Sequence, residues 1–111
     1  MNSPPNGKKP ATRTISIGYW RYREDVIFKS PRVRTVSGEE SGILRGKSAV
    51  RDYWRRILER RPDLDCAVGH VFAGVDSVAL EYRFANGLHG KEFMTVDADA
   101  FSFAVGNDLV R

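Results

Sequence analysis

KSAVRDYWRRILERR, at residues 47–61, is the stretch that decides the fold. Its large apolar residues fall at the i, i+3, i+4, i+7 and i+8 positions of one helical face, namely Val50, Tyr53, Trp54, Ile57 and Leu58. Pro62 follows directly, and proline disfavours helical geometry in the residue before it. We therefore predict an amphipathic helix over 47–61 whose apolar face packs against the rest of the domain.

After this helix the period of the apolar residues changes to two, which is typical of half-buried strands. Two turn signals separate the alternating runs: Gly74-Val75-Asp76-Ser77 and Asn86-Gly87. The runs themselves are residues 66–72, 78–84 and 88–96, with a possible fourth strand at 100–105. Because tight turns join neighbouring antiparallel strands, the pattern predicts a consecutive antiparallel sheet.

The residues before the helix are less regular. Residues 1–13 hold three of the five prolines and are expected to form a disordered tail, with a single domain over 14–111. Val26, Ile27 and Phe28 predict a short strand that stops at Pro31, and the segment 32–44 is expected to be a polar loop. A helix followed by an antiparallel meander is an α+β plan, with the helix covering one face of the sheet.

Composition narrows the function classes. The 111 residues carry a net charge of +4, which is too small by itself to indicate a nucleic-acid binder. No apolar run reaches the roughly 18–20 residues of a membrane helix, and no apolar segment follows Lys8 and Lys9 as a secretory signal would require. We expect a cytoplasmic protein that does not interact with membranes.

Four motifs occur in an order that is familiar from one superfamily. They are YREDVIFKSP at residues 22–31, LRGKSAVRDYW at 44–54, RPDL at 61–64 and DSVALEY at 76–82. In this order and spacing they resemble the nuclear transport factor 2-like superfamily, which includes ketosteroid isomerase and the SnoaL-like polyketide cyclases. The resemblance covers about residues 19–99. It implies a cone-shaped, curved antiparallel sheet wrapped around one or two helices.

The resemblance also implies a pocket for a hydrophobic small molecule inside the cone. The residues expected to line this pocket are Tyr53, Trp54, Tyr82, Phe84 and Met94. Ordinary core packing is an equally open explanation for these side chains. The superfamily has a long first helix, whereas only a short segment precedes Tyr22 here. An absent or shortened first helix would leave the cone open, which favours a homodimer.

The same resemblance places two candidate catalytic residues, Glu92 and His70. The position of the isomerase base falls on Ser30, and a serine without a neighbouring base cannot take a proton near neutral pH. Glu92 falls at the carboxylic acid position of the oxyanion site, where burial would keep it protonated. If adjacent strands bring them together, His70 and Glu92 would form an acid/base pair. A surface glutamate and a core histidine are the structural alternatives, and Asp25 is expected to be structural.

Two functions from different classes remain open. The first is a SnoaL-like small-molecule binding protein or an enzyme of the isomerase or cyclase type, with catalysis left undecided. The alternative is a non-catalytic dimerisation or binding module of the same fold. A third possibility, nucleic-acid binding through the arginines of residues 51–61, has less support because such a face is usually just solvated. The sequence indicates no cofactor, and His70 and His89 lack the spacing of a metal site.

Overall fold

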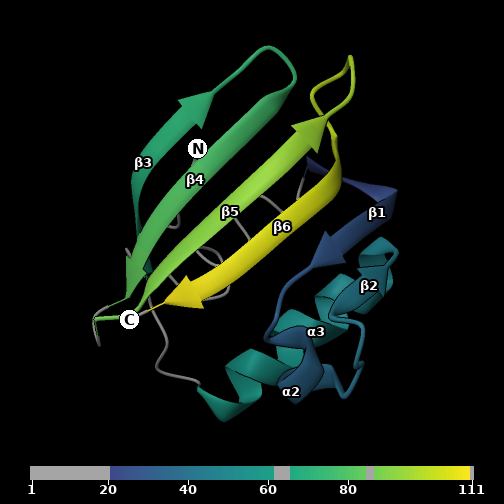
Figure 1. The fold of residues 1–111 in the computed structure, drawn as a ribbon, viewed down its shortest axis with the longest axis vertical. Helices are drawn as coiled ribbons and strands as arrows, with labels where there is room; N and C mark the ends of the chain where they lie inside the picture. The colour runs from purple at the N-terminus through teal and green to yellow at the C-terminus, as the bar shows by residue number, and fades with distance from the viewer. Residues whose placement is uncertain (1–20, 62–65, 85–86, 111) are drawn as a thin grey trace, which may run out of the picture.

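The computed structural model describes residues 21–61, 66–84 and 87–110 as one six-stranded sheet with two helices on one side (Figure 1). The strands are β1 (Tyr22–Lys29), β2 (Ile43–Arg45), β3 (Cys66–Ala73), β4 (Ser77–Phe84), β5 (His89–Val96) and β6 (Ser102–Val110). The helices are α2 (Val33–Ser37) and α3 (Lys47–Arg60). The spatial order of the strands is β2-β1-β6-β5-β4-β3. This is the α+β architecture with a curved sheet and helices that the sequence predicted.

The sheet is mixed rather than purely antiparallel. Strands β3 to β6 form the predicted antiparallel meander, and β1 and β2 are also antiparallel to each other. However, β1 runs parallel to β6, with Phe28 opposite Val105. Alternation along the chain reports which face a side chain takes, but it does not report which distant strand lies alongside or in which direction. The antiparallel expectation was therefore wrong for this one pair.

The segment 32–44, expected to be a polar loop, contains two short elements. Val33 and Val36 are the buried residues of α2, and Leu44, at the centre of β2, is also buried in the core. The apolar residues here are too few and too widely spaced to show a period in the sequence. The predicted tail at 1–13 and the expected loss of the first helix lie outside the described residues, as does Asn86 of the predicted hairpin turn.

Helix α3 matches the predicted helix and ends one residue earlier, at Arg60. Its buried residues are Val50, Tyr53, Trp54 and Ile57, which is the predicted apolar face. Among its arginines, Arg55 pairs with Asp52 and with Glu59, whose carboxylate lies 2.9 Å from the guanidinium. These ion pairs are half-exposed, so they support the interpretation of this side of the helix as an ordinary solvated surface.

The core lies between α3 and one face of the sheet, called here the inner face, which carries Phe28, Met94 and Val105. The ring of Phe28 is centred 5.3 Å from that of Tyr53 and 6.3 Å from that of Trp54. Tilted and edge-on contacts of this kind favour aromatic pairs beyond the area that they bury. The aromatic residues of the helix therefore fix how the helix sits on β1.

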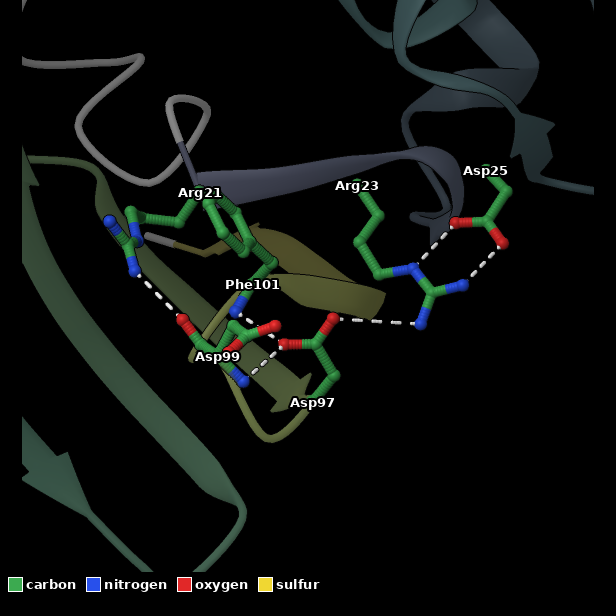
Figure 2. Close-up of polar contacts among 6 residues, drawn as sticks. All are labelled: Arg21, Arg23, Asp25, Asp97, Asp99 and Phe101. Atoms are coloured by element: carbon green, nitrogen blue, oxygen red, sulfur yellow. Dashed lines mark hydrogen bonds and ion pairs between the residues drawn. The ribbon is translucent and has the colours of Figure 1, made fainter.

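The turn between β5 and β6 is anchored by an aspartate at the start of the turn (Figure 2). The Asp97 carboxylate accepts hydrogen bonds from the backbone N–H groups of Asp99 and Phe101, both at 2.9 Å. Arg23 of β1 lies between Asp97, at 3.6 Å, and Asp25, at 2.7 Å. The hydrogen bond from Arg23 holds the pKa of Asp25 below its usual value. Asp25 is therefore one member of an exposed ion pair on β1, and a structural role for it stays a prediction.

Candidate functional site

A carboxyl group is buried on the inner face of the sheet. Glu92 lies on β5, on the same face of the sheet as Gly90 and Met94, and only 3% of the residue is exposed. The hydroxyl of Tyr22 donates a hydrogen bond to its Oε2 atom at 2.8 Å, and the amide of Asn107 donates to Oε1 at 3.0 Å. Both of these donors are neutral groups, so the hydrogen bonds bring no positive charge to the carboxylate.

Strand register explains why these side chains meet. Glu92 on β5 is directly opposite Asn107 on β6, and opposed residues place their side chains on the same face a few ångströms apart. Tyr22 begins β1, which is the neighbour of β6 on its other side. The polar group is therefore assembled from three strands that are adjacent in space, although the residues are 15 and 70 positions apart in the chain.

Burial dominates the electrostatics of Glu92. Removal of the carboxylate from water raises its pKa from 4.5 to about 7, and the hydrogen bonds from Tyr22 and Asn107 oppose this shift without cancelling it. Near neutral pH both the neutral acid and the carboxylate are then populated. A group with a pKa near the working pH is suited to donate or accept a proton, or to donate a hydrogen bond as a neutral acid.

A fourth residue extends the polar group. The Asn107 amide also donates to the hydroxyl oxygen of Tyr82 at 2.7 Å, which joins β4 to the site. The ring of Tyr82 lies directly over Gly90, where an added Cβ atom would come within 2.1 Å of the ring. Glycine at position 90 is therefore what allows Tyr82 to lie flat over β5 and reach Asn107.

The residues predicted to line a pocket are all part of the buried core around this group. They are Tyr53 and Trp54 on α3, Tyr82 and Phe84 on β4, and Met94 on β5. The rings of Tyr82 and Phe84 meet edge-on, with centroids 5.7 Å apart. Such burial is also what ordinary core packing, the alternative explanation, requires, and contact of these side chains with a ligand stays a prediction.

Two buried polar atoms near the carboxyl group have no hydrogen-bond partner within residues 21–61, 66–84 and 87–110. They are the hydroxyl of Tyr53 and the Oδ1 atom of Asn107. Burial raises the pKa of the Tyr53 hydroxyl, and the side chain of Ser30, which is within reach of this hydroxyl, opposes that shift. Ser30, at the position expected for the isomerase base, is buried, and its hydroxyl oxygen accepts a hydrogen bond from the backbone of Arg32 at 3.2 Å. Unpaired polar atoms in a core are rare, and a water or a ligand oxygen usually accounts for them.

The proposed pairing of His70 with Glu92 is not formed. His70 lies on β3, and β4 lies between β3 and the strand of Glu92, β5. Its ring nitrogen is 2.7 Å from Glu81, the residue opposite it on β4, and its side chain is 62% exposed. Glu92 is opposite Leu80 on β4, and Glu81 is the next residue after Leu80, so Glu81 and Glu92 occupy opposite faces of the sheet. The condition that adjacent strands bring His70 and Glu92 together is therefore not met.

Two other kinds of feature are absent from the described ranges. No cluster of three or more histidine, cysteine, aspartate or glutamate side chains there could hold a metal ion. No helix in that part of the chain is long and apolar enough to cross a membrane.

Tyr22 and Asn107 were not identified as site residues from the sequence. Asn107 had a detectable signal, because it is the polar member of an alternating run with Val105 on its face. Tyr22 had none beyond its place in the YREDV motif, since its contact with Glu92 depends on the parallel pairing of β1 with β6.

Comparison with known families gives one match in sequence. The profile of the SnoaL-like domain matches residues 21–109, which is most of the chain. Among curated proteins, none matches this sequence.

Solved structures with the same fold include an isomerase and a protein of unknown function. A SnoaL-like protein of unknown function from Burkholderia thailandensis is 29% identical over 93% of this chain and all of its own, with a TM-score of 0.74. A steroid delta-isomerase from Pseudomonas aeruginosa is 20% identical over 91% of this chain and 71% of its own, with a TM-score of 0.60. TerC, crystallised with polyporic acid, is 14% identical over 89% and 90%, with a TM-score of 0.61. The last two establish a shared fold only.

Proposed function

Since this chain belongs to the SnoaL-like domain family, we propose that it binds an apolar small molecule bearing a carbonyl or similar oxygen, with Glu92 as the group that meets that oxygen. The observation that carries the proposal is the burial of the Glu92 carboxyl group among neutral partners, with a pKa of about 7. A buried acid of this kind costs stability whenever it ionises, and such costs are concentrated at functional sites.

The expected chemistry is hydrogen-bond donation by a neutral acid. In its protonated form Glu92 can donate to a ketone oxygen and stabilise the negative charge that develops there when the ketone enolises. Ser30 offers no base to remove the α proton, because a serine hydroxyl without a neighbouring base does not accept protons near pH 7. The residues thus favour either simple binding or reaction of ligands whose α proton is already acidic.

The aromatic side chains supply the apolar part of the proposed site. Tyr53, Trp54 and Phe84 belong to the buried core on the inner face of the sheet, and the Tyr53 hydroxyl is a neutral group whose pKa both Ser30 and Glu92 affect. A ligand oxygen that reached Glu92 would accept a hydrogen bond from the neutral acid. The isomerase and the polyporic acid complex among the structural neighbours make ligands of this general class a reasonable first choice.

The test compares two probes that differ in one oxygen. Binding of 2-acetylnaphthalene and of 2-ethylnaphthalene is measured by quenching of tryptophan fluorescence between pH 5.5 and 8.5. We expect the ketone to bind roughly 5–10-fold more tightly at low pH, the value of one hydrogen bond, and to lose this preference as Glu92 ionises near pH 7. Neither probe titrates in this range, so a pH dependence reports the protein.

Two glutamine substitutions complete the experiment. Glu92→Gln should make the affinity for the ketone independent of pH, whereas Glu81→Gln, the same change on the opposite face, should leave the wild-type profile intact. Failure of both probes to bind at millimolar concentration, or identical profiles for the two variants, would reject the proposal. The non-catalytic module would then be the better description of the protein.

We also propose that the protein acts as a homodimer, as the sequence suggested, with the subunits meeting on the sheet face opposite Glu92. The cytoplasmic location and the single domain over 14–111 stay predictions.

A further inference from the structure

One positively charged side chain close to the core, Arg32, has no counter-ion. Arg32 lies directly before α2 and is half-buried, and its Nε atom is shielded from solvent and donates no hydrogen bond. In the part of the chain that the structure describes, the arginines found in ion pairs are Arg23, Arg55 and Arg56, and Arg32 is not among them. Because buried charges in proteins are usually paired, an unpaired guanidinium nitrogen indicates that a partner is missing.

The backbone holds Arg32 at a fixed position. The hydroxyl oxygen of Ser30 accepts a hydrogen bond from the N–H group of Arg32 at 3.2 Å, and the carbonyl of Arg32 accepts one from the N–H group of Val36 at 3.0 Å. Ser30 is fixed in turn, since its own N–H group donates to the carbonyl of Gly42 at 3.0 Å. The serine at the position expected for the isomerase base therefore supports an arginine two residues further along.

Arg32 belongs to the same polar group as the buried carboxyl. Burial raises the pKa of the Tyr53 hydroxyl, and the side chain of Ser30 and the positive charge of Arg32 oppose this rise, which places both close to the hydroxyl. The negative charges of Glu92 and Asp108 act on the same hydroxyl in the opposite direction. Tyr53 therefore connects a cationic group, Arg32, with the acid of the candidate site.

The sheet is open beside this polar group. The pairing of β1 with β6 ends at Lys29, whereas β6 continues to Val110, so the last part of β6 has no β1 residue beside it (Figure 1). An open groove of about 550 Å³ lies at this break and is lined by Ser30, after β1, and by Asn107 and Asp108 of β6. The groove offers a ligand a route from solvent to the polar group.

The charges that line the groove favour an anion. Its basic residues are Lys29, Arg34 and Lys91, and its one acidic residue is Asp108. Lys91 is already paired with Glu81 at 2.8 Å, so the remaining excess of positive charge comes from the other two. A cleft lined mainly by one sign of charge attracts ligands of the opposite sign.

A carboxylate is the anion that fits Arg32 best. The two nearest apolar residues of α2, Val33 and Val36, are buried, and a phosphate dianion in such surroundings would need more donors than one guanidinium. A carboxylate is a monoanion whose two oxygens match the fork formed by Nε and a terminal nitrogen. We propose that Arg32 binds the carboxylate of an apolar acid whose apolar part reaches toward Glu92. The inference rests on the small-molecule function proposed above, and it narrows the ligands to acids.

The first experiment compares 2-naphthoate with 2-naphthamide, which have nearly the same shape and differ in charge. Binding is measured by isothermal titration calorimetry at pH 5.5, where Glu92 is mainly neutral and the naphthoate is ionised. The carboxylate should bind about 10–100-fold more tightly, the value of one hydrogen bond to a charged group. Equal affinities, or no binding of naphthoate at millimolar concentration, would overturn the proposal.

Substitutions at Arg32 identify the group that recognises the charge. Arg32→Gln should abolish the preference for naphthoate over the amide, and Arg32→Lys, which keeps the charge, should restore most of it. Arg32→Met retains the apolar stem and replaces the glutamine variant if that variant does not fold. The control is Arg45→Gln, at an exposed position on β2 outside the groove, which should behave as wild type. A preference that survives both neutral variants, or that Arg45→Gln removes as well, would refute the role of Arg32.

Two further measurements separate this inference from the proposed role of Glu92. Glu92→Gln should retain the preference for naphthoate at pH 5.5, whatever the result of the ketone comparison, because Arg32 supplies the charge. Loss of the preference in Glu92→Gln alone would assign the carboxylate to the wrong residue and reject the inference. Inorganic phosphate in excess should not displace naphthoate, and displacement would contradict the choice of a carboxylate.

Discussion

Replacement of Glu92 by glutamine should change how the stability of the protein depends on pH. Below pH 4.5 the carboxyl group is neutral in both states and costs nothing. Between pH 4.5 and about 7 the unfolded chain releases the proton while the folded protein retains it, so stability falls as the pH rises. Above about pH 7 both states are ionised, and the loss is complete.

The magnitude follows from the width of this window. A shift of the pKa from 4.5 to about 7, at ~1.4 kcal/mol per pH unit, gives a loss of about 3 kcal/mol for wild type across the window. Glu92→Gln lacks this contribution and leaves the rest of the sequence unchanged. The difference in unfolding free energy between the two proteins should therefore change by about 3 kcal/mol between pH 4.5 and 8.5.

The assay is urea unfolding at one fixed protein concentration, at five pH values, for both proteins. If the two curves of unfolding free energy against pH run parallel, Glu92 does not have a raised pKa and the reasoning fails. The same result would follow if the carboxyl group were reached by solvent or by a cation in solution.

Three further changes test neighbouring parts of the site and its support. Tyr22→Phe removes a donor that favours the carboxylate, so the pKa of Glu92 should rise by roughly one to two further units in a titration followed by NMR. Gly90→Ala forces the ring of Tyr82 away from β5 and should lower the free energy of unfolding by ~1–3 kcal/mol in urea, while an unchanged value would contradict the close contact. Asp97→Ala removes two hydrogen bonds from the β5–β6 turn and should cost ~1–2 kcal/mol in the same assay, with no change in the pKa of Glu92.

The elements with a strong local period were predictable from the sequence. The stripe from Val50 to Leu58 predicted α3 almost to its ends, and the alternating runs predicted β3 to β5 in the correct antiparallel order. Elements stabilised by distant contacts were less predictable. β2 is three residues long and exists because it pairs with β1, and no pattern of three residues can indicate that.

The site was predictable in part for the same reason. Glu92 could be placed on the buried face because it alternates with Met94, and the aromatic residues could be placed in the core by their periods. The prediction for His70 assumed that side chains alternate regularly along β3, which would put His70 on the same face of the sheet as Val68. The register shifts between Val68 and His70, so the two side chains lie on opposite faces. A bulge of this kind has no clear signature in a single sequence.

The central claim is that Glu92 is a neutral acid over part of the physiological pH range. The most direct measurement is the pH titration of its side-chain carboxyl carbon by NMR in protein labelled with carbon-13 glutamate, with the resonance assigned by its absence from Glu92→Gln. The account predicts a midpoint near pH 7. A midpoint at or below pH 4.5 would contradict it, because the carboxylate would then be as well solvated in the folded protein as in water.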